Sequence, residues 1–167
     1  MIFVTVGTQL RFDRLVAPCA EWLGRTGRAC FIQHAGYPLS LDPLPNAAFL
    51  GPHETAQLMS KATLVIAHAG MGTILSCLSN GTPLIVMPRK ASLGEHRNEH
   101  QLETVRWLRE RQGVVVADDE RALRTLLDSH PAETERTPRI TDTASPELLA
   151  AVRDFIWDGR TPPPPRA

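Results

Sequence analysis

The residues whose types and spacing could do chemistry begin with residues 68–73, His-Ala-Gly-Met-Gly-Thr. They follow a short apolar run at 63–67 that predicts a buried strand, and apolar residues at helical spacing come next, at 74–80. A strand, a glycine turn and a helix present free backbone N–H groups and a positive helix end to a phosphate. His68 and Thr73 would flank that anion with side-chain donors. The alternative is a tight turn that binds no ligand.

A second candidate is the sequence His-Arg-Asn-Glu-His at 96–100, which matches the H-x-x-E-H pattern of inverted zinc proteases. His96 and His100 are four residues apart, so on one helix they could share a metal ion. A catalytic zinc also needs a third protein ligand. The candidates for that ligand, in or just beyond a predicted linker, are Glu133, Glu135 and Glu147. The competing interpretations are a polar helix start that faces solvent and a set of sugar contacts, and we expect no metal site.

Composition excludes several other classes of site. The chain has 18 Lys and Arg against 18 Asp and Glu, so no basic surface for nucleic acid is indicated. The Gly-Met-Gly turn at 70–72 is not a dinucleotide fingerprint, because the third glycine would fall at Leu75, and no Walker-type phosphate loop occurs. Cys19, Cys30 and Cys77 form no C-x-x-C pair, which favours a reduced, cytoplasmic setting over a disulfide framework.

Strands and helices alternate along the chain, so we predict an α/β fold, a doubly wound parallel sheet with right-handed crossovers. Such sheets bind ligands at the carboxyl ends of their strands. Three polar loops lie there, at 7–12, 68–73 and 89–101. We expect strands at 2–6, 29–33, 47–50, 63–67, 83–88 and 114–116. We expect helices near 54–60, at 74–80, at about 95–111 and at 146–157, and two more that begin after a capping Asp13 and after a capping Asp118 or Asp119.

We predict a nucleotide-binding domain at 1–130, a linker at 131–145, an amphipathic docking helix at 146–158 and a Pro-rich tail at 159–167. The helix opens with Ser-Pro-Glu, which puts proline at the first helical position. Its apolar stripe has to be buried, against the domain or against a partner. The apolar run at 2–6 is too short for a signal peptide or a membrane span, so membrane association is expected to come from a surface or a partner.

Several stretches together resemble a known family. Residues 68–73, with Gly-Thr-Pro at 81–83 and Pro88, resemble the donor-binding box of GT-B nucleotide-sugar glycosyltransferases. Val-Thr-Val-Gly-Thr-Gln at 4–9 resembles the start of their carboxy-terminal, family 28-like domain. The block at 88–101 resembles the short subunit of two-component bacterial exopolysaccharide glycosyltransferases, relatives of the catalytic subunit of eukaryotic UDP-GlcNAc transferase. The resemblance implies the Rossmann-like half of a GT-B enzyme.

This resemblance also implies roles for individual residues. It assigns the diphosphate-contacting histidine and hydroxyl to His68 and Thr73. Where many relatives grip the ribose with glutamate, this chain has Ser76, which could still donate one hydrogen bond. The catalytic residue is not identified, and His68 is a candidate. The predicted donor-binding residues are Thr8, Gln9, His68, Gly70, Met71, Gly72, Thr73 and Ser76, and the predicted sugar-binding residues are Arg89, Glu95, His96, Arg97, Asn98 and Gln101.

The function implied is that of a donor-binding and catalytic subunit of an inverting glycosyltransferase. It would move a hexose or hexuronic acid from a UDP-sugar to a lipid-linked saccharide in exopolysaccharide synthesis, with no cofactor and no metal. A complete GT-B enzyme binds its acceptor with a second domain, so a membrane-associated partner subunit is expected, with this chain peripheral at the cytoplasmic face. The alternatives are a non-catalytic UDP-binding regulatory subunit and, less favoured, a zinc hydrolase.

The basic residues of the last block bear on the donor sugar. Arg97 lies where relatives hold neutral sugar hydroxyls with an acidic or amide residue, and Arg89 and Lys90 are expected on the same rim. A guanidinium is the natural bidentate partner of a carboxylate, so one hypothesis is UDP-glucuronate. The alternative is that these residues face anionic lipid or the pyrophosphate of a lipid-linked acceptor.

Overall fold

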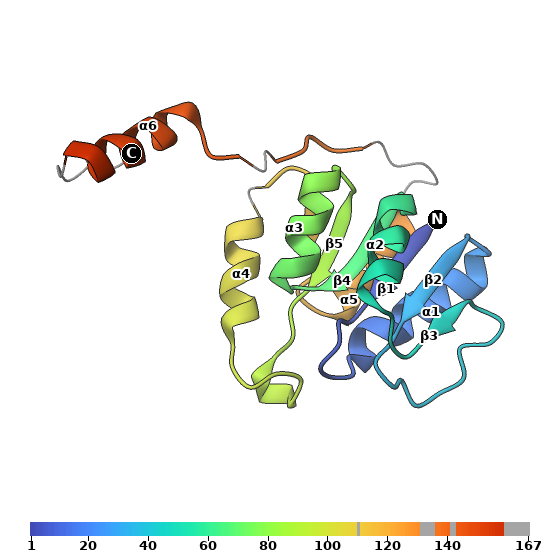
Figure 1. Ribbon diagram of the computed structural model, residues 1–167. Helices are drawn as coiled ribbons and strands as arrows, with labels where there is room; N and C mark the ends of the chain where they lie inside the picture. The colour runs from blue at the N-terminus through green and yellow to red at the C-terminus, as the bar shows by residue number, and fades with distance from the viewer. Residues whose placement is uncertain (110, 131–135, 141–142, 159–167) are drawn as a thin grey trace.

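The computed structural model describes residues 1–109, 111–130, 136–140 and 143–158. Within them, six strands form one sheet in the order β3-β2-β1-β4-β5-β6, and every neighbouring pair is parallel. The predicted α/β fold with a parallel, doubly wound sheet is therefore confirmed (Figure 1). The strands are β1 (Ile2–Thr5), β2 (Cys30–Gln33), β3 (Asn46–Ala47), β4 (Leu64–His68), β5 (Leu84–Met87) and β6 (Val114–Val116).

Helices cover both faces of the sheet. α1 and α5 pack together on one face, and α2, α3 and α4 lie on the other (Figure 1). The helices are α1 (Asp13–Thr26), α2 (Pro52–Lys61), α3 (Met71–Asn80), α4 (His100–Leu108), α5 (Glu120–Ser129) and α6 (Pro146–Asp158), and a short 3₁₀ turn, η1 (Ala91–Leu93), precedes α4.

The central strands are buried on both faces. In β1, Ile2 and Val4 pack in the apolar layer of α1 and α5, whereas Phe3 packs in the layer that contains Ile74 of α3 and Val105 of α4. β4 and β5 alternate in the same way, which explains why these segments read as continuous apolar runs. Each large side chain buried in this way contributes about 1.5–3 kcal/mol to the stability of the fold. The carboxyl edge of the sheet is therefore held rigidly and positions the loops that follow it.

The helix predicted at 95–111 is shorter than expected, because α4 begins at His100. The Glu95 carboxylate accepts a hydrogen bond from the Lys90 N–H at 2.9 Å and pairs with Arg14 Nε at 2.6 Å. It therefore closes a turn instead of opening a helix. Local pattern could not give this result, because Arg14 lies 81 residues earlier in the chain.

Two capping predictions have opposite outcomes. Asp13 does not cap α1: the N-cap is Phe12, and Asp13 is the first helical residue, paired with the neighbouring Arg11. Asp119 caps α5, since its carboxylate accepts a hydrogen bond from the Ala122 N–H at 2.8 Å.

Part of the predicted linker is held on the domain. Residues 136–140, which we call the strap, run past the carboxyl-terminal end of α3, where the Thr137 N–H donates to the Gly81 carbonyl at 2.9 Å. Gly81 and Gly113 have positive φ angles of 64° and 84°, and a Cβ at either would lie 2.5 Å from an atom of Thr137. Only glycine suits both positions. The linker positions outside the described residues are 131–135 and 141–142.

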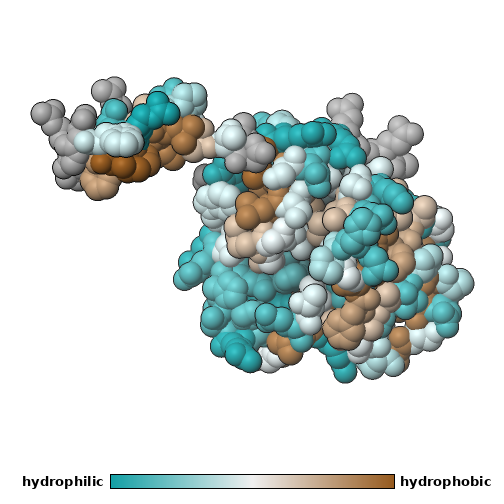
Figure 2. All heavy atoms as spheres, in the orientation of Figure 1, coloured by the Kyte–Doolittle hydropathy of each residue, from teal (hydrophilic) through white to brown (hydrophobic). Residues whose placement is uncertain are grey.

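The terminal helix α6 lies apart from the sheet and its covering helices (Figure 1). The predicted amphipathic helix is present, and its apolar surface lies exposed along one side (Figure 2). It does not cap the domain. Its exposed apolar residues are Leu148, Leu149, Val152, Phe155, Ile156 and Trp157. Among the described residues, no helix combines the length and the apolar character needed to cross a membrane. The predicted tail, 159–167, lies outside the described residues.

The contact between the strap and Gly113 gives a first prediction. Gly113→Ala should lower the free energy of unfolding by about 1–3 kcal/mol, because alanine is strained at positive φ and its methyl group meets Thr137. Urea denaturation measures this change. Gly24→Ala in α1 is the control, since a Cβ there meets no atom within 4 Å, and it should not destabilise the protein. An unchanged urea midpoint for Gly113→Ala would contradict the position of the strap.

Candidate functional site

A cleft of about 670 Å³ opens at the carboxyl ends of β1, β2 and β4. This volume lies in the range of small-molecule sites. All three loops that the sequence predicted at this edge contribute to it. The lining residues are Thr5, Val6, Gly7, Thr8, Gln9, Leu10, Gln33, Leu50, Pro52, Thr55, Ala56, Met59, His68, Gly70, Gly72, Thr73, Ser76, Arg89, His96, His100 and Gln101.

The amino terminus of α3 forms one wall of the cleft. Gly70 is the N-cap, with extended backbone, and no side chain among the described residues caps the helix. The first turn of an α-helix has N–H groups without intrahelical partners, and it carries the positive end of the helix dipole. A Cβ added to Gly72 would meet no atom within 4 Å, so an anion can approach this backbone closely. Thr73 lines the same wall. The wall is suited to bind a phosphate group.

The His68 ring sits between two glycines. A Cβ on Gly7 would lie 2.7 Å from ring atom Cε1, and a Cβ on Gly70 would be closer still to the ring. Gly7 also has a positive φ of 76°. Both glycines are therefore needed for the ring to lie at the floor of the cleft, where the loops after β1 and β4 meet.

Burial sets the protonation state of His68. Burial, and next the positive charge of Arg89, lower its pKa to about 4. The ring is therefore neutral at pH 7. The backbone of Thr5 lies beside the ring and opposes this shift, without reversing it. The Nδ1 atom is buried and has no well-aligned hydrogen bond in the portion of the chain that is described.

The predicted donor-binding residues are brought together, with two differences. Thr8, Gln9, His68, Gly70, Gly72, Thr73 and Ser76 all line the cleft, and Met71 does not. The Ser76 hydroxyl donates to the Gly72 carbonyl at 2.8 Å, so its proton is used within α3. In this geometry Ser76 can accept a hydrogen bond from a ribose hydroxyl but cannot donate the bond that the sequence suggested.

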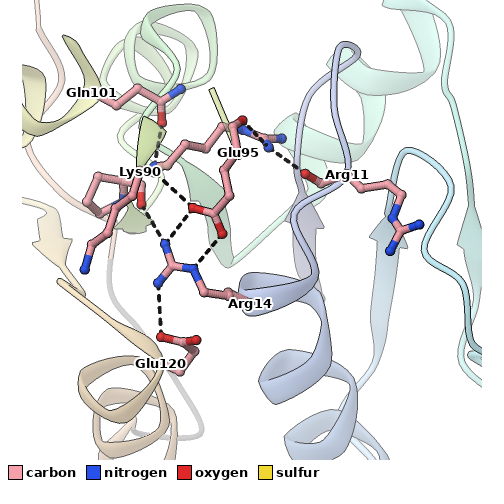
Figure 3. A network of polar contacts seen from close by, with 8 residues as sticks. Arg11, Arg14, Lys90, Glu95, Gln101 and Glu120 are labelled. Carbon is pink, nitrogen blue, oxygen red and sulfur yellow. Dashed lines mark hydrogen bonds and ion pairs between the residues drawn. The ribbon is translucent and has the colours of Figure 1, made fainter. Parts of the chain in front are cut away.

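The predicted sugar-binding residues divide into two groups. His96, Gln101 and Arg89 line the cleft, whereas Arg97 and Asn98 are exposed outside its lining. Arg89 is not the exposed rim residue that the sequence predicted, because it is only 3% exposed and bonds to backbone carbonyls. Glu95 also lies outside the cleft lining, and its carboxylate pairs with Arg14 (Figure 3).

The two histidines of the H-x-x-E-H sequence do not share a helix. His96 lies in a turn and His100 begins α4, with their ring centroids 4.5 Å apart, edge to face. Among the described residues, no group of three or more His, Cys, Asp or Glu side chains is arranged to hold a metal ion. Both rings line the cleft. Their position is consistent with contacts to a bound ligand.

Sequence reasoning missed the wall that α2 provides. Leu50, Pro52, Thr55, Ala56 and Met59 line the cleft, opposite α3. The sequence carried no signal for this wall, because these residues match no ligand-binding pattern and only the fold brings them to the cleft. In the structure Met59 is the one buried residue of the ten in α2. The buried Gln33 was also missed, because a single amide in a strand carries no recognisable pattern.

The chain resembles proteins of known class. It matches the glycosyltransferase family 28 C-terminal domain over residues 1–129. It is 31% identical, over 121 residues, to the human UDP-N-acetylglucosamine transferase subunit ALG13, covering 64% of this chain. The chain spans only 10% of that human protein.

Solved structures show the same fold. The glycosyltransferase of kitacinnamycin superposes with a TM-score of 0.54 at 21% identity, over 78% of this chain and 35% of that one. The calicheamicin glycosyltransferase CalG4 gives 0.51 at 19% identity, over 76% and 33%. The solution structure of ALG13 gives 0.55 at 20% identity, over 89% and 92%. The chain spans about a third of the first two.

The burial of His68 predicts a pH-dependent stability. The unfolded histidine has a pKa of about 6.5, whereas the folded one has a pKa of about 4. Between these values the unfolded state binds more protons, so the free energy of unfolding should fall as the pH falls from 6.5 to 4, by about 3 kcal/mol in total. Urea denaturation across this range measures the effect.

Comparison with variants isolates the contribution of His68. His68→Gln should remove most of that pH dependence, and Thr125→Ala, on the exposed side of α5, should keep it. Identical pH profiles for the wild type and His68→Gln would show that His68 titrates equally in both states, contrary to its burial.

Proposed function

Because the chain belongs to the glycosyltransferase family 28 C-terminal domain family, we propose that it is the donor-binding subunit of an inverting glycosyltransferase. Its donor is a UDP-sugar that carries a hexose or hexuronic acid, and it uses no metal and no cofactor. The observation that carries the proposal is the cleft in which the uncapped amino terminus of α3, the neutral His68 and the Gly7–Leu10 loop meet.

These groups suit the chemistry of the leaving group. In an inverting transfer the bond from the sugar to the diphosphate breaks as the acceptor hydroxyl attacks, and the diphosphate gains negative charge. Fixed N–H groups and a helix dipole stabilise charge that develops in the transition state. Thr73 and the first turn of α3 can do this for the diphosphate, with the His68 ring as a neutral donor beside them.

The acceptor hydroxyl needs a general base. With a pKa of about 4, His68 is a weak base at neutral pH, which argues against it as the catalytic base. The lining includes no Asp or Glu among the described residues, which leaves His96 and His100 on this chain. We therefore favour a base supplied by a partner that also binds the acceptor.

Such a partner is the second part of the proposal. The human relative is named as a subunit of a UDP-N-acetylglucosamine transferase, which supports a multi-subunit enzyme. We propose that the partner is membrane-associated and presents a lipid-linked saccharide in exopolysaccharide synthesis, with this chain peripheral at the cytoplasmic face. The exposed apolar side of α6 supplies a docking element for it.

The nature of the sugar stays open between a neutral hexose and a uronate. The uronate hypothesis drew on Arg89 and Arg97 together. Since Arg89 is buried among carbonyls, Arg97 is left as its support, and Arg97 lies outside the cleft lining. A second candidate function is a non-catalytic UDP-binding regulator, which the scarcity of base candidates in the cleft favours. Such a regulator would bind UDP and support no transfer with any partner.

UDP binding tests the site directly. His68→Ala and Thr73→Ala should each weaken UDP binding by about 1–3 kcal/mol, the usual cost of losing a hydrogen bond to a charged group. Isothermal calorimetry measures the affinity. Thr125→Ala is the matched control, because its hydroxyl bonds within α5, on the other face of the sheet. Unchanged UDP affinity in both cleft variants would place the nucleotide elsewhere.

Docking through α6 is tested by co-purification with a co-expressed membrane-associated glycosyltransferase subunit. Removing residues 145–167 should abolish co-purification, because it removes the exposed apolar side chains of α6. Phe155→Asp should weaken it strongly, and Asp154→Ala, which removes no apolar side chain, should not. A truncated chain that still assembles would exclude α6 as the docking element.

A further inference from the structure

The loop between β1 and α1 forms one lip of the cleft, yet its own side chains do little to fix it. Thr8, Gln9 and Leu10 are exposed. Resting on the proposed function, we propose that Arg89 is a positioning residue: it holds the backbone of residues 6–11 in the shape that binds the diphosphate of the donor.

The Arg89 guanidinium bonds to the backbone at both ends of this loop. Nη2 donates to the Val6 carbonyl at 2.8 Å and to the Leu10 carbonyl at 2.6 Å. Nη1 donates to the Arg11 carbonyl at 2.7 Å and to the Glu95 carbonyl at 3.3 Å. One side chain from the end of β5 therefore ties the first and last residues of the loop to each other and to the neighbouring loop.

The buried charge of Arg89 is balanced by dipoles and an aromatic ring. Its terminal nitrogens donate to four carbonyl oxygens, and the Phe12 ring centroid lies 4.7 Å from the guanidinium carbon. Burial lowers the pKa of Arg89 to about 10, so the side chain stays positively charged at neutral pH. A cation held in this way is fixed in orientation, because turning it would leave buried donors and acceptors unpaired.

A second set of contacts, made by Gln101, Glu95, Arg14 and Glu120, surrounds Arg89, and Figure 3 labels these four residues. The Arg89 N–H donates to Gln101 Oε1 at 3.0 Å. Glu95 is clamped by Arg14, whose Nε and Nη2 lie 2.6 and 2.7 Å from its two oxygens, and Arg14 also reaches Glu120 at 3.0 Å. The network therefore connects the loop to α1, α4 and α5.

Gln33 holds the start of the loop from the opposite side. Its Oε1 accepts a hydrogen bond from the Val6 N–H at 3.1 Å, and its Nε2 donates to the Gly7 carbonyl at 2.9 Å. Val6 thus has its N–H bound to Gln33 and its carbonyl bound to Arg89. The turn into the cleft is set by two buried side chains that need not touch the ligand.

A loop held in its binding shape spares the ligand the entropic cost of ordering it. The forked, planar donor set of arginine is required, because Nη2 serves Val6 and Leu10 while Nη1 serves Arg11 and Glu95. The single ammonium of lysine can replace at most one of these two nitrogens. Arg89→Lys keeps the charge and removes the fork. It should therefore loosen the loop and reduce affinity for ligands that use it.

The experiment compares Arg89→Lys with the wild type by calorimetry and by NMR relaxation of backbone amides. The affinity for UDP should fall about 10-fold or more. The affinity for UMP should fall much less, because UMP lacks the second phosphate. Order parameters of residues 7–11 should fall, while those of α5 should not.

Arg25→Lys, at an exposed pair with Asp128, is the matched control. Gly113→Ala controls for a general loss of stability.

The outcomes separate the two proposals. A wild type that does not bind UDP overturns the proposed function. A wild type that binds UDP, with Arg89→Lys binding it equally tightly or with unchanged order in the loop, overturns only the role of Arg89. Equal losses for UDP and UMP, matched by Gly113→Ala, also overturn it. Should Arg89→Lys fail to fold, Glu95→Gln loosens the same network and should reduce UDP affinity in the same direction.

Discussion

The register between β1 and β4 is the constraint on which the site depends. Thr5 pairs with Ala67 in parallel, so the two strands end side by side and their loops enter the cleft together. The His68 ring then fills the space between the loops, which only Gly7 and Gly70 leave open. The apolar layers on both faces of the sheet fix this register, since a shift by one residue would move each side chain into the opposite layer, which is packed around side chains of other sizes. Core packing and the geometry of the cleft are therefore coupled.

Much of this arrangement was predictable from the sequence, because it depends on local pattern. Continuous apolar runs indicated the buried strands, and the glycine turn at 68–73 indicated the helix amino terminus that lines the cleft. The parallel topology then brought Thr8, Gln9, His68 and Thr73 to one cleft. The cap of α5 was predicted at Asp118 or Asp119, and the structure identifies Asp119 as the capping residue.

The parts that were missed depend on long-range partners. Arg89 was expected on the rim, but carbonyls 78 to 83 residues earlier draw it into the interior. Glu95 was expected to open a helix, but Arg14 holds it in a turn. In both cases the side chain can satisfy its bonding capacity better with a distant segment than with its neighbours, and no spacing rule in a single sequence reveals that choice.

The strap has a consequence for how two subunits could work together. It leaves the domain at the carboxyl-terminal end of α3, whereas the cleft opens at the amino-terminal end of the same helix. A partner that binds α6, as proposed above, would thus be tethered to the side of the domain opposite the mouth of the cleft. Such a tether would keep the local concentration of the partner high, and it would not obstruct the mouth of the cleft. Spent nucleotide could then exchange for fresh donor without separation of the pair.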